Sequence, residues 1–480
     1  MYGGVSLSQY SSQPLSGFGA GQMSDVQDLQ KALEAGYQIS GQTGGSALRV
    51  ESLEGSLKVV TYTANHIKFW KKIPKSAAYS TVEEYNQLTS YGSNAGAFVQ
   101  EGELPPSQDT TYARRTSLVK YIGVTKEVTH PMTVVHPAHG DVIALENQNG
   151  ILWLLQRIED ALFHGDSSLA FDGESEQWDG LDALIDPTSF IDLEGDPIQE
   201  ADIEEAANQL VEQFAYPTDL WLGNRVASDL VKTFYPRERV QLPAPQNGMV
   251  GMTINSMMTQ AGVIEMNPNV FLRRAPSPSA SATSASAPTA PASAVGAVVA
   301  AADGDFNKGN PAGTNFFGYA VTAANRFGES APTFNATNVT ITQAEKDGAD
   351  HITVTITNPG VIGAFQPEYF NIYRTNDMGT AVASTDPADY SLIARIPSAS
   401  VTGAGVTVFT DVNFILPFMQ TAYLGQMTPD VLTMRQLLPM LRMDLAVLSP
   451  AYRWLILMYA CPLLFAPAKW CRLINIGQLV

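Results

Sequence analysis

The strongest constraint on the fold is one long helix predicted over residues 141–164, within the stretch DVIALENQNGILWLLQRIEDALFHGD. Its apolar residues recur at i, i+4, i+7 and i+11, which places them on one helical face. Gly140 and Asp141 are suited to turn the chain into the helix and cap it, and Gly165 to end it in the left-handed conformation. Gly150 costs about 1 kcal/mol relative to alanine inside a helix, so tertiary packing must hold this structural strut. The apolar face consists of Ile151, Leu155, Ile158 and Leu162.

The composition is that of a globular protein with several cores. A chain of 480 residues has room for two to four domains. Hydrophobic residues make up 45% and charged residues 16%, which excludes a disordered chain. The formal net charge of −19 argues against a protein that grips nucleic acid through its phosphates. An acidic protein is better suited to enclose DNA than to read it.

The cysteines and the apolar segments indicate neither an oxidising compartment nor a membrane. Cys461 and Cys471 lie in an apolar C-terminal region and are predicted to be free buried thiols. The N-terminus lacks the pattern of a secretory signal. Residues 454–466 form the most apolar run, which is too short to span a bilayer and is predicted to be a buried strand. We therefore expect a soluble protein.

A long projecting hairpin is predicted directly before the helix. Strand-like patterns cover residues 56–79 and 112–134, and the polar, Gly-rich residues 84–108 are expected to form the loop between them. Because an isolated two-stranded hairpin is marginal in water, this one is expected to lie on something else, such as a neighbouring subunit. Ahead of it, residues 1–46 are predicted to be a mostly flexible N-terminal arm with a short helix over 25–34.

A mixed α/β body is predicted after the long helix. Helices are expected over 200–214 and 224–234, with a strand over 220–222 between them. Residues 239–272 are predicted to be β-structure.

The composition then changes abruptly and marks an insertion. Residues 275–302 carry no charge and are dominated by Ala, Ser, Pro and Thr, so their first two-thirds is predicted to be a linker. Short strands follow at the spacing of a β-sandwich, and residues 276–413 are therefore predicted to be an all-β domain inserted into a host. The host resumes over 414–480, with a helix from Pro429 that stops near Leu438 and buried strands in YRWLILMYA and WCRLINI. The sandwich strands are expected at 315–325, 337–343, 351–358, 367–374, 390–396 and 405–411.

These blocks carry a family likeness. The segments HIKFWKKIPKSAAYSTVEEYNQLTSYG, FVQEGELPPSQDTTYARRTSLVKYIGVTKEVTH and ENQNGILWLLQRIEDALFHGD resemble the major capsid protein of tailed bacteriophages, the phage/herpesvirus shell fold. The insert resembles a fibronectin type III or immunoglobulin-like domain in FFGYAVTAANRFGES and YFNIYRT. The expected fold class is α+β with an inserted all-β sandwich. The resemblance implies an extended loop over 57–129, a spine helix over 141–164, a peripheral domain within 47–195, and an axial domain over 196–275 completed by 414–480.

The resemblance also implies a function and partners. Subunits of this family form hexamers and pentamers that close into an icosahedral shell around double-stranded DNA, without sequence-specific DNA binding. The implied location is the virion, assembled in the host cytoplasm. The implied partners are a separate scaffolding protein and a portal, with a cement protein as a further candidate. The insert would project outward as a decoration or a host-surface contact.

Four charged residues in or near the hairpin loop are the candidate inter-subunit contacts: Glu101, Glu103, Arg114 and Arg115. The alternative is that they are solvated loop charges, and the sequence leaves the two readings balanced. Covalent crosslinking through the nearby lysines would need a matched asparagine and a catalytic acid that the sequence does not reveal. Ordinary surface lysines are therefore favoured at Lys71, Lys72 and Lys75.

No catalytic, cofactor or metal site is predicted. The phosphate-binding, nucleophile-elbow and zinc-protease motifs do not occur. Three groups of polar residues are interpreted as structural. His130, His136 and His139 are assigned to a hairpin-to-helix junction, and Asp303, Asp305 and Asn307 to a polar turn that fails the calcium-loop pattern. The third group is a solvated acidic run of Asp192, Glu194, Asp196, Glu200, Asp202, Glu204 and Glu205.

Two functions from other classes compete with the shell protein. A surface adhesin or decoration protein built on the sandwich would predict an anchor and several sandwich repeats. A polysaccharide hydrolase with an accessory sandwich would predict an aromatic cleft with two carboxylates about 5–10 Å apart. A cellular nanocompartment with the same shell fold is a close variant of the leading hypothesis.

Overall fold

The computed structural model describes residues 60–92, 97–135, 140–169, 177–234, 254–272, 275–358, 365–398, 405–447 and 449–479. The predicted N-terminal arm over 1–46, with its helix over 25–34, lies outside the described residues, as do residues 239–253. Residues 59–134 and 142–480 form one compact unit, and all elements below belong to it.

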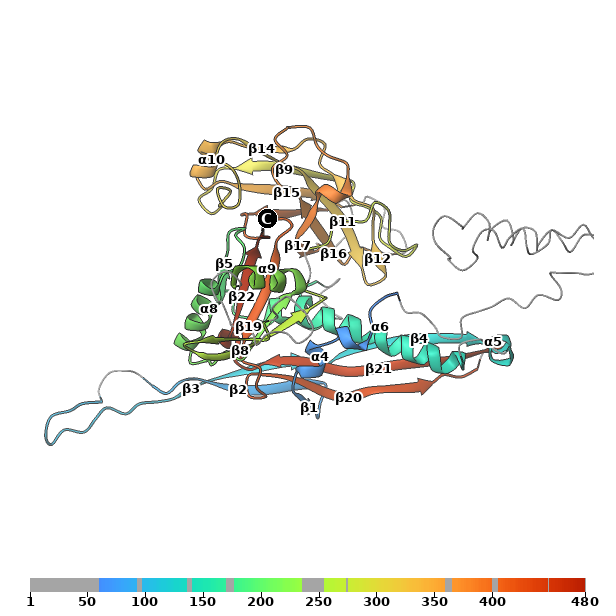
Figure 1. Cartoon of the computed structure of the whole chain (residues 1–480), viewed down its shortest axis with the longest axis horizontal. Coiled ribbons are helices and arrows are strands. Elements are labelled where there is room, and N and C mark those ends of the chain that lie inside the picture. Colours follow the sequence, from blue (N-terminus) through green and yellow to red (C-terminus); the bar gives the residue numbers. More distant parts are fainter. Residues whose placement is uncertain are drawn as a thin grey trace, which may run out of the picture. The chain divides into compact units, whose positions relative to one another are not determined.

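The long helix is confirmed as α6 (Val142–His164) (Figure 1). Leu154, Ile158 and Leu162 on its inner face are buried in the largest hydrophobic core. Gly150 is also buried, and a Cβ there would lie 2.8 Å from Cδ1 of Ile456 on the underlying sheet. The glycine therefore lets the helix lie closely against that sheet, which explains why the sequence accepts its low helix propensity.

Gly165 follows the helix, but the reason predicted for it is wrong. Its φ is not in the left-handed region, which Gly140 does adopt at φ +94°. A Cβ on Gly165 would instead lie 2.5 Å from the carbonyl oxygens of both Ala161 and Trp178. The position needs glycine because the last turn of α6 and the backbone at Trp178 both approach it closely.

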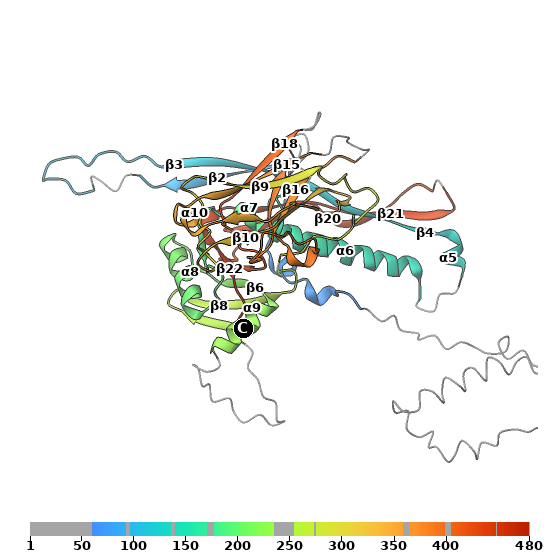
Figure 2. The same cartoon turned by 90° about the horizontal axis from the view of Figure 1, so that it is seen from above.

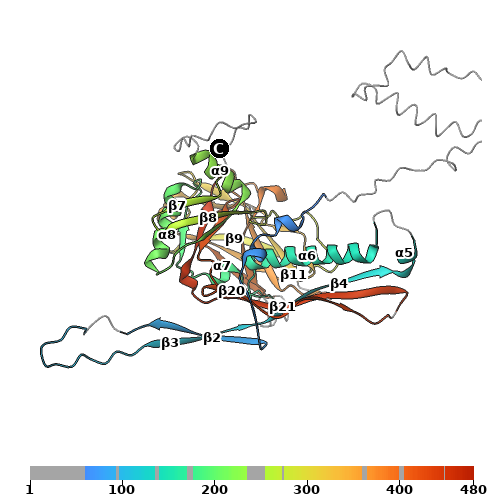
Figure 3. The ribbon, with the colours of Figure 1, turned by 60° about the horizontal axis from the view of Figure 1, so that its bottom comes forward.

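The sheet below α6 joins segments from both halves of the sequence (Figures 1 and 3). Its strand order is β1–β20–β21–β4, with a parallel pair between β1 and β20 and antiparallel pairs elsewhere. The predicted buried strand is confirmed in β21, whereas the helix predicted from Pro429 is wrong because that segment is β20. Pro439 lies within a register shift of β20, between Leu438 and Leu441, as expected for a residue without an N–H to donate to the ladder. The strands are β1 (Lys75–Ala77), β4 (Lys120–Thr129), β20 (Leu432–Asp444) and β21 (Ala451–Leu464).

The predicted hairpin exists, with different strands. β2 (Val82–Ser90) pairs antiparallel with β3 (Thr111–Leu118), and Figure 2 shows them extending away from the body. Within the described part of the strand predicted over 56–79, only β1 is a strand, and the first hairpin strand falls largely in the segment predicted as loop. The single strand predicted over 112–134 corresponds to three elements, β3, β4 and α5. The other elements here are η2 (Ala64–His66), α4 (Phe69–Lys72) and α5 (His130–Val134).

A second, six-stranded sheet has the order β5–β22–β19–β6–β8–β7. Two helices pack with it around a second core, to which α8 contributes Ile203 and Leu210 and α9 contributes Val226 and Leu230. The predicted helices, central strand and WCRLINI core strand are confirmed. The elements are α7 (Leu181–Leu184), β5 (Phe190–Asp192), α8 (Glu200–Glu212), β6 (Asp219–Gly223), α9 (Asn224–Phe234), β7 (Ser256–Thr259), β8 (Gly262–Asn269), β19 (Gln420–Gly425), η4 (Pro467–Lys469) and β22 (Trp470–Ile476).

Within its described residues, the predicted insert over 276–413 forms three sheets. The two larger ones have the orders β18–β15–β9 and β12–β11–β16–β17, with β13 also paired to β11, and the third is the pair β10–β14. Buried residues of the two larger sheets, such as Val354 and Phe370, belong to one hydrophobic cluster. Each predicted strand range contains a strand, whereas β9, β12 and β13 were not predicted. The elements are β9 (Ser293–Val299), β10 (Asn315–Phe317), β11 (Tyr319–Asn325), β12 (Gly328–Glu329), β13 (Thr333–Phe334), β14 (Val339–Ile341), α10 (Gln343–Asp347), β15 (His351–Thr357), β16 (Tyr369–Arg374), η3 (Pro387–Asp389), β17 (Ser391–Pro397) and β18 (Val406–Asp411).

Both cysteines are buried and free, as predicted. Burial raises the pKa of Cys461 to about 11 and that of Cys471 to about 12, so both are protonated thiols at neutral pH. Among the helices of the described residues, none combines the length and apolarity that crossing a membrane requires.

Candidate assembly surface

The hairpin presents large apolar side chains to solvent. Phe98 is 99% exposed, Leu104 92% and Tyr112 67%. Scattered exposed hydrophobics are ordinary, but a concentration of them on one projecting element marks an interaction surface. We call this set the hairpin surface: Val82, Leu88, Tyr91, Phe98, Val99, Leu104, Tyr112 and Leu118.

Among the described residues of the hairpin, those near its base contact the body. Tyr85 packs edge-on against Phe465 with ring centroids 5.0 Å apart. Gln87 donates from Nε2 to the carbonyl oxygen of Phe465 at 2.6 Å. These contacts fix the direction of the hairpin and leave its distal apolar residues for another partner.

The four predicted contact residues do not form one cluster. Glu101 and Glu103 are exposed in the loop between β2 and β3, whereas Arg114 and Arg115 are exposed on β3. Arg114 pairs with Glu84 across the hairpin, with Nη2 and Oε2 2.5 Å apart. The structure therefore gives Arg114 a partner within its own chain, and the inter-subunit roles of all four remain predictions.

A buried carboxylate that the sequence analysis did not single out joins three parts of the body. Glu159 of α6 is completely buried and accepts hydrogen bonds from the backbone N–H groups of Lys68, Phe69 and Trp70 at 3.1, 2.8 and 2.8 Å. It also accepts one from Nδ2 of Asn269 at 2.7 Å. The carboxylate thus caps the start of α4 from a distant helix, and the chain entering the hairpin is held in place.

The lysines near α4 form more ion pairs and hydrogen bonds than expected of ordinary surface lysines. Lys72 pairs with Asp219 and with Glu265, the latter at 2.6 Å. Burial alone would lower the pKa of Lys72. The hydrogen bonds to Asp219 and Glu265 outweigh burial, so the pKa is raised above its ordinary value. Lys71 and Lys75 donate to backbone carbonyls of Ala64 and Trp70.

A second polar cluster closes the C-terminal end of α6. Nδ1 of His164 lies 2.7 Å from Oδ2 of Asp182, and the hydroxyl of Tyr423 donates to Oδ1 of the same carboxylate at 2.7 Å. Burial lowers the pKa of His164, but the hydrogen bond and charge of Asp182 outweigh it and raise the pKa. The reciprocal interaction lowers the pKa of Asp182 against its own burial.

The insert contains a buried ion pair beside its junction with the host. Arg374 is completely buried and donates to Oδ2 of Asp411 and Oδ1 of Asn413, both at 2.5 Å. The hydroxyl of Tyr319 donates to the same oxygen of Asp411 at 2.8 Å. Burial, followed by the Asp411 charge, raises the pKa of Tyr319 well above its usual range. An arginine at the end of the apolar run YFNIYRT was the one sequence signal for this site.

The same polar network continues into the six-stranded sheet. Nδ2 of Asn413 donates to the carbonyl of Lys308 at 3.0 Å, and Nζ of Lys308 pairs with Oδ2 of Asp192 at 2.7 Å. Asn475 donates to the other oxygen of Asp192 at 2.8 Å and accepts from the N–H of Leu416 at 2.8 Å. Asp192 and Asn475 belong to host strands, so the insert is tied to the host by directional bonds.

Several of the remaining polar candidates have structural partners. His130 lies near the ring of Tyr452, whereas His136 and His139 are outside the described residues. Oδ1 of Asp303 contacts Nδ1 of His351 at 2.7 Å. Oδ1 of Asp305 accepts from the N–H of Lys308, and Asn307 bonds with Gln343 and Asp347. Within the described residues, no group of three or more His, Cys, Asp or Glu could hold a metal ion.

The described residues combine a projecting hairpin that exposes apolar side chains, a long helix packed on a sheet, and buried polar clusters. Comparison with known proteins shows which class of protein this chain resembles. The chain is 28% identical over 462 residues to the major capsid protein of Staphylococcus phage K, covering 94% of this chain and 96% of that protein. The corresponding protein of Staphylococcus phage S25-3 gives the same identity and coverage. No family model matches the chain.

Solved structures give a weaker likeness. The capsid structure of the cyanophage P-SCSP1u covers 90% of this chain and 94% of its own, with 9% identity and a TM-score of 0.40. An encapsulin complex from Synechococcus elongatus PCC 7942 covers 89% and 93%, with 8% identity and a TM-score of 0.43. The sequence relatives carry the conclusion: the resemblance to phage major capsid proteins is confirmed. Their names are those of structural proteins, in agreement with the prediction that the chain is not an enzyme.

Proposed function

We propose that this protein is the major shell subunit of a tailed-phage head, forming hexamers and pentamers that close into an icosahedral capsid around double-stranded DNA. The observation that carries the proposal is the hairpin surface, whose apolar residues have no core of their own to enter. Apolar area of this kind is covered by association. The similarity to named capsid proteins over nearly the whole chain supports the same function.

Assembly would proceed by laying each hairpin across an adjacent subunit. A head-to-tail contact of this kind is heterologous, and it generates a closed ring when the rotation between subunits is right. The anchored base and the Glu159 cap hold the hairpin in one direction, so little conformational freedom is lost when it docks. Glu101 and Glu103 are the candidates for charged contacts at its loop.

The proposal assigns the domains with the limits that were predicted from the sequence. The extended loop is placed within 57–129, the peripheral domain within 47–195, and the axial domain within 196–275 and 414–480. The insert over 276–413 is assigned as a fibronectin- or immunoglobulin-like domain that projects outward. Its two larger sheets around one core support the sandwich assignment. Its network with Asp192 and Asn475 would hold it at a fixed angle.

The proposed partners follow from the shell. A separate scaffolding protein, a portal and a cement protein are candidates, and the location is the virion after assembly in the host cytoplasm. The net charge of −19 disfavours tight binding of the DNA backbone and would leave packaged DNA free to move.

Negative-stain electron microscopy of the protein, expressed with and without a scaffolding protein of the same phage, tests the proposal. We expect closed shells or rings of five and six subunits. The double variant Phe98→Ser, Leu104→Ser should fold normally, because both side chains are exposed, and should form neither. Val382→Ser removes another exposed apolar side chain, on the insert, and should assemble normally. A wild-type protein that stays monomeric under every condition would contradict the proposal.

A further inference from the structure

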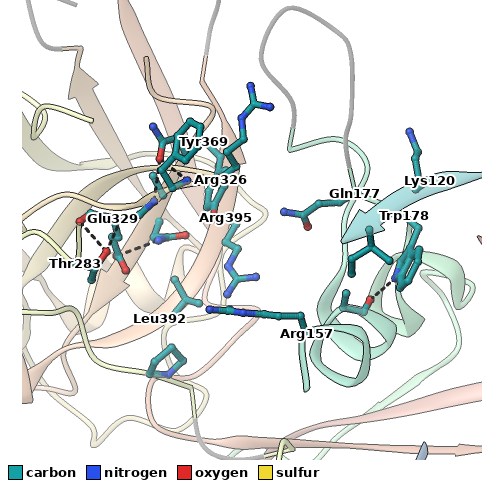
Figure 4. Close-up of a pocket in the computed structure, with 18 of the residues that line it drawn as sticks. Lys120, Arg157, Gln177, Trp178, Thr283, Arg326, Glu329, Tyr369, Leu392 and Arg395 are labelled. Carbon is teal, nitrogen blue, oxygen red and sulfur yellow. Dashed lines mark hydrogen bonds between the residues drawn. The ribbon is translucent and has the colours of Figure 1, made fainter. Parts of the chain in front are cut away.

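A polar cavity of about 750 Å³ lies between the insert and the body. Its walls come from α6 and β4 on one side and from β11, β16, β17 and adjoining turns of the insert on the other. Figure 4 shows Arg157 and Trp178 on the body side facing Arg395 and Glu329 on the insert side. The volume is within the range of about 300–1,000 Å³ that is usual for small-molecule sites.

The cavity is basic although the chain is acidic. Its lining contains four cationic residues, Lys120, Arg157, Arg326 and Arg395, and one acidic residue, Glu329. Oε1 of Glu329 already accepts three hydrogen bonds from its own sheet, so that carboxylate is held against the strands. The donors are Thr322, Asn371 and Tyr373 at 2.5, 3.0 and 2.5 Å.

Two of the cations lack a counter-charge. Arg326 pairs with Glu368 at 3.4 Å, but neither Arg157 nor Arg395 forms an ion pair with any described carboxylate. Arg157 instead lies over the ring of Trp153, 5.5 Å from its centroid. Figure 4 shows the side chains of Arg157 and Arg395 pointing toward one another across the cavity. Converging like charges repel, and an anion placed between them removes that repulsion.

We propose that this cavity binds a small phosphate-bearing molecule, with the phosphate held between Arg157 of α6 and Arg395 of β17. The planar guanidinium group matches phosphate oxygens in a bidentate geometry. The cavity is much larger than one phosphate group, and Trp153, Phe327 and Tyr369 in its lining offer apolar surface to the rest of the molecule. A bound ligand bridges the insert and the spine helix, and therefore stabilises their association by mass action.

Calorimetric titration of the full-length protein with inorganic phosphate, pyrophosphate and adenosine monophosphate tests the site, at constant ionic strength set with potassium chloride. We expect saturable binding by at least one of these ligands and a rise in the unfolding temperature with ligand concentration. Tighter binding of the nucleotide would identify an organic phosphate as the ligand, and tighter binding of pyrophosphate a free polyphosphate. Either result supports the site.

Three variants locate the binding. Arg157→Gln and Arg395→Gln should each weaken it at least tenfold. Arg453→Gln on β21 removes an equal charge, from an ion pair with Glu127 of β4, and should leave the binding unchanged. Absence of binding to the wild type, or equal binding by all variants, overturns the proposal. Asp172, Glu174 and Glu176 lie outside the described residues and shortly precede the lining residues Gln177 and Trp178 in the sequence. Binding seen only after their replacement by Asn, Gln and Gln would also overturn the proposal.

Discussion

Oε1 of Glu159 accepts a hydrogen bond from Nδ2 of Asn269 at 2.7 Å, and both side chains are completely buried. This bond connects α6 to β8 of the second sheet, and the same carboxylate caps α4. Asn269 is held in turn by the N–H of Phe271, which donates to its Oδ1 at 2.8 Å. Helix α6, the start of α4 and strand β8, which are distant in sequence, therefore meet at the buried carboxylate of Glu159. Hydrogen bonds compensate the negative charge of this carboxylate.

Replacement Glu159→Gln should destabilise the protein by about 2–4 kcal/mol. The amide keeps one acceptor but points an NH₂ group at a backbone donor, and hydrogen bonds to charged groups contribute about 1.5–3 kcal/mol each. Urea unfolding of both proteins measures the difference. Glu146→Gln on the same helix loses only a half-exposed ion pair with Lys126 and should cost less than about 1 kcal/mol. Equal effects of the two changes would show that the capping role is unimportant.

Replacement Arg374→Met should destabilise the insert by about 3–5 kcal/mol, because it leaves the carboxylate of Asp411 buried without its cation. Urea unfolding followed by far-ultraviolet circular dichroism measures the loss of stability. Arg442→Gln breaks an exposed pair with Asp444 and should have an effect below about 1 kcal/mol. A near-neutral Arg374→Met variant would refute the idea that this pair holds the junction.

The elements that sequence predicts well are those whose own residues carry the pattern. Helix α6, strand β21 and the insert strands are all marked by apolar periodicity that matches their burial. Helix α9 is predicted with its observed limits for the same reason.

The failures are elements whose stability comes from distant partners. Strand β2 has the polar sequence VEEYNQLTS and is held by pairing with β3, and β20 accommodates Pro439 because β21 and β1 flank it. The buried charges were missed for a related reason. Nothing local distinguishes Glu159 from the exposed Asp160 beside it, since its donors lie about 90 residues before and 110 residues after it.

Replacement Gly150→Ala should destabilise the protein although alanine favours helix. The gain in helix propensity is about 1 kcal/mol, but the new Cβ would lie 2.8 Å from Cδ1 of Ile456. Overpacking of this kind costs about 1–3 kcal/mol, so the net change should be a loss of up to about 2 kcal/mol. The double variant Gly150→Ala, Ile456→Val removes the clashing methyl group and should recover stability. Failure of this rescue would mean that the helix-to-sheet distance does not set the requirement for glycine.

The contribution of His164 to stability should disappear as the solution becomes alkaline. Its pKa is raised in the folded state, so its interaction with Asp182 stabilises fully below the ordinary value of 6.5 and is lost as pH rises through the folded pKa. The lowered pKa of Asp182 acts in the opposite direction, and its contribution is lost only as pH falls below the ordinary value of 3.8. Urea unfolding of wild type and His164→Gln from about pH 6 to 9 should give converging stabilities. A constant difference across that range would exclude a charged histidine.

The double variant Glu101→Gln, Glu103→Gln decides between contact and solvated charge at the hairpin loop. Both side chains are exposed, so folding should be unaffected. If they meet cations of a neighbouring subunit, each contributes up to about 1 kcal/mol, and the protein concentration at which shells appear should rise about tenfold. Because salt screens exposed pairs, added salt should weaken assembly of the wild type more than that of the variant. Glu205→Gln, Glu212→Gln removes equal charge from exposed positions on α8 and should assemble as the wild type does. Identical assembly and salt dependence in all three proteins would assign the hairpin carboxylates to solvent and leave its apolar surface as the source of subunit affinity.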